Sequence, residues 1–289
     1  MTVARVVVVT DSTAYLPHDL VAAHGIEVVP LQVVLGGRPF DEGSGLSGHD
    51  IAEALRHSRS VSTSRPAPAQ LLEVYERVAA AGASEVVSVH LSRELSGTYD
   101  SAVLAAKEAS VPVHVVDSRS LGMGTGFAVL GAAEVLAAGG SAESAVVAVR
   151  RRVEATSTMF YVDTLEHLRR GGRVTVARAL IGTALAVKPL LHVVDGRIEP
   201  LENVRTSGRA LARLEELAVE RAGTSPVDIA VHHLVNADRA QALADRLTSR
   251  VPAARTVLVQ EVGPVVGAHV GPGLVAVVVA PVLDAGSGA

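Results

Sequence analysis

The strongest constraint on the fold is a repeated pattern of short Val-rich runs that each end in polar residues. Val3–Val9 leads into Thr10–Thr13, and similar runs cover 85–91 and 113–116. Apolar runs of this length are typical of strands buried on both faces of a parallel sheet. An amphipathic helical pattern over 70–81 lies between two of them. The order of strand, polar loop and helix predicts an α/β sheet with functional loops at the carboxyl ends of its strands.

The pattern changes after a predicted helix over 141–154. A hairpin is expected over 192–201, with Asp195-Gly196 at its turn. Further along the chain we expect helices over 210–218 and 236–249, and strands over 228–232, 256–260 and 274–280. The sequence therefore predicts two domains, an N-terminal, mainly parallel α/β domain over 1–153 and a C-terminal α+β domain over 154–284. A ligand cleft is expected at their interface.

Composition excludes several classes of protein. The 289 residues are 48% hydrophobic and 19% charged, which favours a folded chain with a sizeable core. Cys is absent, so disulfides and Cys-based zinc sites are excluded. A net charge of -4 without a basic stripe disfavours nucleic acid as a partner. The start of the chain lacks a basic signal-peptide region, and the apolar stretch Leu274–Leu283 is too short to span a bilayer. We expect a soluble, cytoplasmic protein.

Two segments have the composition of anion sites at helix starts. Thr63–Pro66 precedes the helical pattern over 70–81 and offers hydroxyl groups, including that of Ser64. In the second segment Ser96 and Thr98 flank Gly97, which lets a ligand approach the backbone. A simple helix cap explains either segment equally well, but the recurrence of the arrangement favours anion binding.

Two further segments bring cationic side chains beside glycines. Arg173 follows Gly171 and Gly172, and its guanidinium suits a carboxylate or phosphate, although a solvated basic turn is the plainer interpretation. His269 lies in Gly263–Gly273, where four glycines and two prolines interrupt regular structure. We expect a loop there, with a functional histidine.

Other motifs are absent or fail. The sequence has no phosphate-binding P-loop, no H-E-x-x-H zinc motif and no G-x-S-x-G nucleophile motif. Gly122–Gly126 lacks the last glycine of a dinucleotide-binding loop, because Phe127 stands there. His232 and His233 would point to opposite faces of a strand, which disfavours a joint metal site. No metal or cofactor is expected.

Together these segments form an ordered set that resembles the DegV family over nearly the whole chain. The matching segments are Thr10–Pro17, Thr63–Pro66, Leu95–Tyr99, Val116–Ser118, Gly171–Val174, Lys188-Pro189, Glu202–Thr206 and Gly267–Gly273. The resemblance implies two α/β domains with a fatty acid in a tunnel between them, and no catalytic activity of the chain's own. It also implies similarity to the fatty acid-binding component (FakB) of bacterial fatty acid kinase. There a separate ATP-binding kinase converts the bound acid to an acyl phosphate for phospholipid synthesis, with acyltransferases as further partners.

The resemblance also implies roles for individual residues. Thr63 and Ser96 would bond the carboxylate, beside Ser64 and Gly97. Arg173 and His269 would line the head-group end and meet the phosphate, and Arg205 would lie on the surface that meets the partner. Two departures from the family pattern are Arg65, where Gln is usual, and Val270, where Thr is frequent.

Two other functions remain open from the residues alone. A hydrolase or acyltransferase would use Ser96 and His269, with Asp117 as a third member. A regulatory module for a phosphorylated metabolite would use the same anion sites without a lipid. The first predicts ester turnover and the second predicts stabilisation by phosphate esters.

Overall fold

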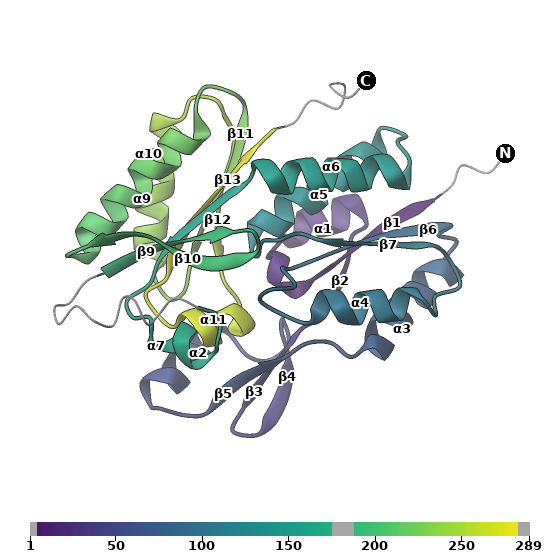
Figure 1. Ribbon diagram of the computed structural model, residues 1–289, viewed down its shortest axis with the longest axis horizontal. Coiled ribbons are helices and arrows are strands. Elements are labelled where there is room, and N and C mark those ends of the chain that lie inside the picture. The colour runs from purple at the N-terminus through teal and green to yellow at the C-terminus, as the bar shows by residue number, and fades with distance from the viewer. Residues whose placement is uncertain (1–4, 175–187, 283–289) are drawn as a thin grey trace. The chain divides into compact units, whose positions relative to one another are not determined.

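The structure, a computed structural model, describes residues 5–174 and 188–282. By its internal contacts this part of the chain divides into two compact units (Figure 1). Unit 1 contains residues 5–31 and 64–155, and unit 2 contains the other described residues. Each unit has its own sheet and its own helices.

Unit 1 is built on a parallel sheet in the order β2-β1-β6-β7. Its strands are β1 (Val6–Asp11), β2 (Glu27–Val29), β6 (Glu85–His90) and β7 (Val113–Asp117). The three Val-rich runs of the sequence pattern are therefore strands, and the parallel α/β sheet is confirmed. The chain moves from β1 to β2 on one side and later to β6 on the other. Such a reversal of strand order is where open α/β sheets bind ligands.

Helices cover both faces of this sheet (Figure 1). They are α1 (His18–His24), α3 (Pro68–Ala80), α4 (Thr98–Ala106), α5 (Met123–Ala137) and α6 (Ala142–Ala155), with a short 3-10 helix η1 (Ser12–Ala14) after β1. Alternate residues of β1 point to opposite faces. Val7 and Val9 pack with Leu71 and Tyr75 of α3 and with Ala102 of α4. The helix predicted over 70–81 is α3, and its apolar side forms this core.

Unit 2 contains a six-stranded sheet in the order β10-β9-β8-β13-β11-β12. Its strands are β8 (Ser157–Tyr161), β9 (Lys188–Val194), β10 (Arg197–Val204), β11 (Val227–His233), β12 (Ala254–Glu261) and β13 (Val275–Pro281). Among the pairs formed by these six described strands, β11–β12 is parallel and the other four are antiparallel. Asp195 and Gly196 both have positive φ angles, 49° and 82°, as a tight hairpin turn requires. The predicted hairpin is confirmed.

Two long helices pack on one face of this sheet (Figure 1). They are α9 (Ser207–Ala222) and α10 (Ala237–Arg250). Leu214 and Leu217 of α9, and Leu243 and Leu247 of α10, are buried in one core with Ile229 of β11. Both helices were predicted from the sequence; α9 is longer than the predicted 210–218 at both ends, and α10 is displaced by one residue from the predicted 236–249.

Residues 32–63 belong to unit 2, which corrects the predicted domain division at 153/154. They form β3 (Gln32–Leu35), β4 (Arg38–Asp41), α2 (Gly48–Arg56) and most of β5 (Val61–Ser64), with the strands in the order β4-β3-β5. Glu42 accepts a 2.9 Å hydrogen bond from the backbone of Val265. A Cβ on Gly48 would lie 2.7 Å from Leu234, so α2 packs closely against the rest of unit 2. A division by chain order misses this excursion because these contacts join residues about 190 to 220 positions apart in sequence.

The segment predicted as a glycine-rich loop is mostly helical, which is a second correction. Helix α11 (Pro264–Val270) begins with a proline, whose fixed φ angle suits the first turn. It ends at Gly271, whose φ angle of 73° needs a glycine. Gly267 lies inside the helix because a side chain there would press on Leu234. The glycines and the proline therefore set the two ends of a short helix and allow it to pack closely on Leu234.

Candidate functional site

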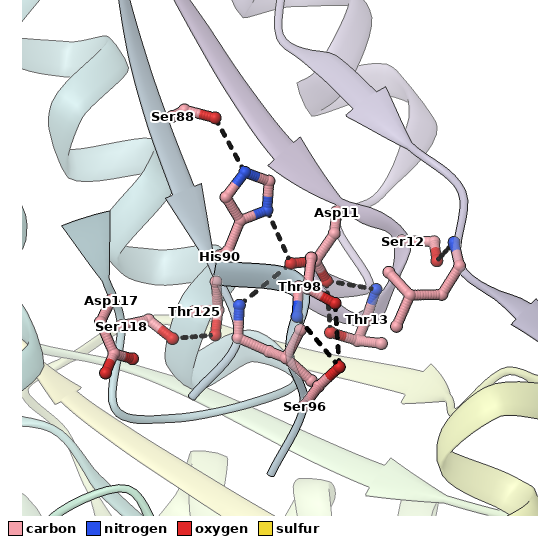
Figure 2. Close-up of polar contacts among 12 residues, drawn as sticks. Asp11, Ser12, Thr13, Ser88, His90, Ser96, Thr98, Asp117, Ser118 and Thr125 are labelled. Atoms are coloured by element: carbon pink, nitrogen blue, oxygen red, sulfur yellow. Dashed lines mark hydrogen bonds and ion pairs between the residues drawn. The ribbon is translucent and has the colours of Figure 1, made fainter. Parts of the chain in front are cut away.

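The carboxylate of Asp11, at the end of β1, organises the loops at the carboxyl edge of the unit 1 sheet (Figure 2). One of its oxygens accepts bonds from the backbone N–H and the hydroxyl of Thr13, at 3.1 and 2.5 Å. The other accepts from His90 Nδ1 and from the backbone of Leu91, both at 3.0 Å. The side chains of Asp11 and His90 are fully buried. Four donors nearly saturate a carboxylate, so this buried group is satisfied and is not available to a ligand.

His90 continues this network away from the strand ends. Its Nε2 lies 2.8 Å from Ser88 Oγ, and Ser88 Oγ lies 2.8 Å from the Tyr75 hydroxyl. Burial raises the pKa of Tyr75 to about 12, with the bond to Ser88 acting in the opposite direction. One assignment of protons gives every member of the chain a partner. Tyr75 donates to Ser88, Ser88 donates to Nε2, and the Nδ1–H of a neutral His90 donates to Asp11.

Backbone hydrogen bonds tie the three strand-end loops of unit 1 together. The N–H of Ser118 donates to His90 O at 2.9 Å, and that of Ser92 donates to Ser120 O at 2.8 Å. The N–H of Gly122 donates to Thr13 O at 2.9 Å. The loops after β1, β6 and β7 are therefore joined to one another at the carboxyl edge of the sheet.

Ser96 and Thr98 form a hydroxyl pair in the loop after β6. Their oxygens lie 2.9 Å apart, and Ser96 Oγ also accepts a 3.3 Å bond from the backbone of Thr98 at the first turn of α4 (Figure 2). The guanidinium of Arg65 lies over Gly97, since a Cβ added there would be 2.0 Å from Arg65 Nη1. Gly97 thus leaves room for a cation beside the hydroxyl pair.

A second cluster lies within unit 2. The hydroxyl of Thr63, on β5, and Nε2 of His269, on α11, are joined by a 2.9 Å hydrogen bond. Burial, with the nearby positive charge of Arg173, lowers the pKa of His269 to about 4. The imidazole is therefore neutral at pH 7. Arg173 Nη1 donates to the carbonyl of Gly171, which holds the guanidinium at the end of α7 (Glu166–Arg170).

Gly171 seats the ring of His269. A Cβ at Gly171 would lie 2.4 Å from His269 Nδ1, closer than any real contact. The φ angle of Gly171 is -73°, which any residue adopts, so its lack of a side chain is what matters. Gly271 does the same for the neighbouring His167, with a Cβ position 2.2 Å from the His167 ring.

The structure divides the predicted site residues between the two units. Thr63, Arg173 and His269 form the cluster in unit 2. Ser64, Ser96 and Gly97 belong to unit 1, where the boundary falls directly after Thr63. The predicted partner-surface residue Arg205 is exposed in unit 2, between β10 and α9.

The hydrolase alternative gains no triad geometry within either unit. Asp117 accepts bonds from the backbone of Arg93 and Arg119 and so closes two turns. Ser96 bonds Thr98 instead of a histidine. Asp117 and Ser96 belong to unit 1, whereas His269 belongs to unit 2 and bonds Thr63.

Other features of the described residues bear on ligands. Across residues 5–174 and 188–282, no group of three His, Asp or Glu side chains could hold a metal ion. None of the helices described is long and apolar enough to cross a bilayer. A cavity of about 620 Å³ in unit 1 is lined by the starts of β1 and β6 and the ends of α1 and α5. It lies at the amino edge of the sheet, and neither Ser96 nor Gly97 lines it.

The sequence does not predict the buried network around Asp11. The pattern places Asp11 in a polar loop and His90 in an apolar run, with no link between them. A histidine at the end of a Val-rich strand, directly beside a strand that ends in Asp, was the available signal. The seat that Gly171 provides for His269 left no such signal, because it depends on contacts about 100 residues apart.

Comparison with known proteins agrees with this architecture. The family model described as "uncharacterised protein, DegV family" matches residues 5–282. A DegV domain-containing protein of Streptomyces coelicolor is 58% identical over 275 residues, covering 95% of this chain and 98% of the relative.

Solved structures give the same result. A DegV family protein from Thermus thermophilus, described by its fatty acid binding, superposes with a TM-score of 0.91 at 34% identity, covering 96% of this chain and 100% of that one. DegV of Bacillus subtilis, described as a fatty acid-binding protein, has a TM-score of 0.89 at 33% identity with the same coverage. The match of sequence and fold over almost the full length shows that this chain belongs to the DegV family.

Proposed function

We propose that this protein binds a long-chain fatty acid and holds its carboxyl group at the Thr63–His269 pair. The observation that carries the proposal is the 2.9 Å bond between Thr63 Oγ1 and a buried, neutral His269 with Arg173 nearby. Structural relatives of about one-third identity that are described as fatty acid-binding proteins support the choice of ligand.

The protonation of this pair suits a carboxylate. A neutral His269 with its hydrogen on Nε2 donates to Thr63 Oγ1, which leaves the hydroxyl hydrogen of Thr63 to donate to the ligand. Hydrogen bonds to an ionised acceptor are shorter and stronger than bonds between neutral groups. Arg173 adds a positive charge that offsets the cost of burying a carboxylate. An acyl phosphate carries more negative charge, so the same guanidinium would stabilise it more.

The acyl tail would supply most of the affinity. Each buried methylene contributes about 0.8 kcal/mol, so a sixteen-carbon chain gains on the order of 10 kcal/mol before the costs of ordering it. The head group then determines placement more than affinity. Substitutions at Thr63 should therefore weaken binding by a modest factor and change how the carboxyl group is held.

Ser96, Ser64 and Gly97 are proposed to contact the same carboxylate. Thr63 and Ser96 belong to different units, so a double-mutant cycle is the appropriate test. If both hydroxyls bond one carboxylate, the losses in binding free energy for Thr63→Val and Ser96→Ala will not add. Additive losses would show that Ser96 does not share the ligand group.

The proposal extends to presentation of the bound acid to a separate ATP-dependent kinase, with the chain itself non-catalytic. Exposure of Arg205 beside the start of α9 supports a role in meeting that partner. Arg205→Glu should then lower acyl phosphate formation by a bacterial fatty acid kinase supplied in the assay, with fatty acid binding unchanged. Ester hydrolysis by the isolated chain that is lost in Ser96→Ala would refute the non-catalytic role.

The test of fatty acid binding uses a matched pair of variants. Displacement of a fluorescent fatty acid by palmitate would be measured for the unsubstituted protein, Thr63→Ser and Thr63→Val. Thr63→Ser keeps the hydroxyl and should bind within about twofold, whereas the isosteric Thr63→Val should lose about tenfold, the equivalent of one hydrogen bond. Equal affinity of all three proteins would refute the placement of the carboxylate, and no displacement in any would refute the function.

A further inference from the structure

The segment that carries the Ser96–Thr98 hydroxyl pair begins at Leu91, directly after β6. The backbone N–H of Leu91 donates to Asp11, and so does Nδ1 of His90, the residue before it. Both bonds end on the same carboxylate oxygen. The start of the segment is therefore fixed by an acceptor on β1 that His90 helps to hold.

We propose that His90 is a positioning residue for the fatty acid head group, acting through Asp11 and the segment from Leu91 to Thr98. The inference rests on the proposed contact of Ser96 with the ligand. His90 touches neither Ser96 nor the ligand. Its part is to supply the fourth donor to the Asp11 carboxylate, so that the carboxylate keeps one orientation.

The burial of the pair makes this donor necessary. Both side chains are fully buried, so no water can readily replace a donor that is lost. A carboxylate that lacks one donor must shift, gain a proton or admit water. Each of these changes moves the oxygen that accepts from Leu91, and with it the start of the segment. Because Ser96 N donates to Ser92 O at 3.1 Å, a shift at Leu91 is passed to the hydroxyl pair within one turn.

The other side of the ring has a different role. Ser88 Oγ contacts Nε2, and the Tyr75 hydroxyl of α3 contacts Ser88 in turn, away from the strand ends. When the Ser88 hydroxyl donates to Nε2, the ring hydrogen is on Nδ1. Nδ1 faces Asp11, and Nε2 faces Ser88, so the two nitrogens can be tested separately.

Two substitutions separate them. The amide nitrogen of Asn takes the place of Nδ1, so His90→Asn keeps the donor to Asp11 and loses the bond to Ser88. The amide of Gln reaches the place of Nε2, so His90→Gln keeps the bond to Ser88 and loses the donor to Asp11. Fatty acid affinity should stay within about twofold in His90→Asn and fall about tenfold in His90→Gln. A merely structural role would lower the melting temperature of both variants and leave their affinities equal.

A measurement on the unsubstituted protein covers the case in which a variant does not fold. Nitrogen-15 chemical shifts of the imidazole should show a hydrogen on Nδ1 of His90. An Nδ1 without a hydrogen would overturn the proposal, as would equal affinities of the two variants. If the unsubstituted protein takes up no fatty acid, the proposed function fails. The positioning role is then decided by the backbone amide shifts of Ser96 and Thr98, which should change in His90→Gln and not in His90→Asn.

Discussion

The seat that Gly171 forms for His269 allows a sharp test of the head-group cluster. In Gly171→Ala the new Cβ would lie 2.4 Å from His269 Nδ1, whereas ordinary contacts are 3.4 Å or longer. The Gly171 backbone already has a helical conformation, so alanine is compatible with it and should cost nothing there. The whole effect should therefore fall on the histidine ring.

The size of the effect follows from the distances. The ring must move by about 1 Å, which disturbs its 2.9 Å bond to Thr63. If Thr63 needs that bond to orient its hydroxyl toward the carboxylate, binding loses at most what Thr63→Val loses, the free energy of one hydrogen bond, about 1.5 kcal/mol. This corresponds to a roughly tenfold weaker fatty acid affinity.

The neighbouring glycine provides the control. Gly172 has a φ angle of +70°, and a Cβ there would meet no heavy atom within 4 Å. Gly172→Ala should lower the free energy of unfolding by about 1 kcal/mol through backbone strain and leave affinity unchanged. Displacement of a fluorescent fatty acid and thermal unfolding would be measured for both variants. Unchanged affinity in Gly171→Ala, or equal losses of affinity in both, would refute the role of His269.

Three further predictions concern stability. Burial lowers the pKa of both His232 and His269 to about 4, below the value of about 6.5 in an unfolded chain, so stability is full above pH 6.5 and is lost as pH falls through 4. Each histidine contributes on the order of 3 kcal/mol to this loss. The melting temperature should therefore fall less steeply between pH 6.5 and 4 in His232→Gln than in the unsubstituted protein, and an equal fall in both would contradict this. Asp11→Ala should cost about 3–5 kcal/mol in urea unfolding because it leaves buried donors without an acceptor, and a loss below 1 kcal/mol would show that the network is dispensable. Gly273→Ala should destabilise by more than 1 kcal/mol, since φ is +91° and a Cβ would lie 2.1 Å from an Asp163 oxygen; thermal unfolding checks this.

Much of the fold could be predicted because its strands have strong local signals. Val-rich runs and a two-residue Asp-Gly turn can be recognised from a few neighbouring residues, so the sequence predicted β1, β6, β7 and the β9–β10 hairpin. The placement of residues 32–63 in unit 2 was not found, because the strands there have only four residues each and the contacts of this segment with Leu234 and Val265 lie far along the chain. Helix α11 was missed because glycine and proline disfavour helices on average, whereas here they mark its ends.

The candidate site was predictable in its residue types and less so in its arrangement. Thr63, Arg173 and His269 were singled out by hydroxyl, cation and glycine content, and the structure brings these three together in unit 2. The partner of His269 could not be read from the sequence, since Thr63 lies 206 positions away. The neutral state of the imidazole depends on burial, which a local pattern does not reveal.

Native mass spectrometry of the purified protein can show directly whether the chain holds a fatty acid. A fatty acid-binding protein should carry an added mass equal to one long-chain fatty acid, or take up one equivalent of palmitate after it has been stripped of lipid, with weaker retention in Thr63→Val. Protein that carries no lipid and takes up none from an excess of palmitate or oleate would contradict it.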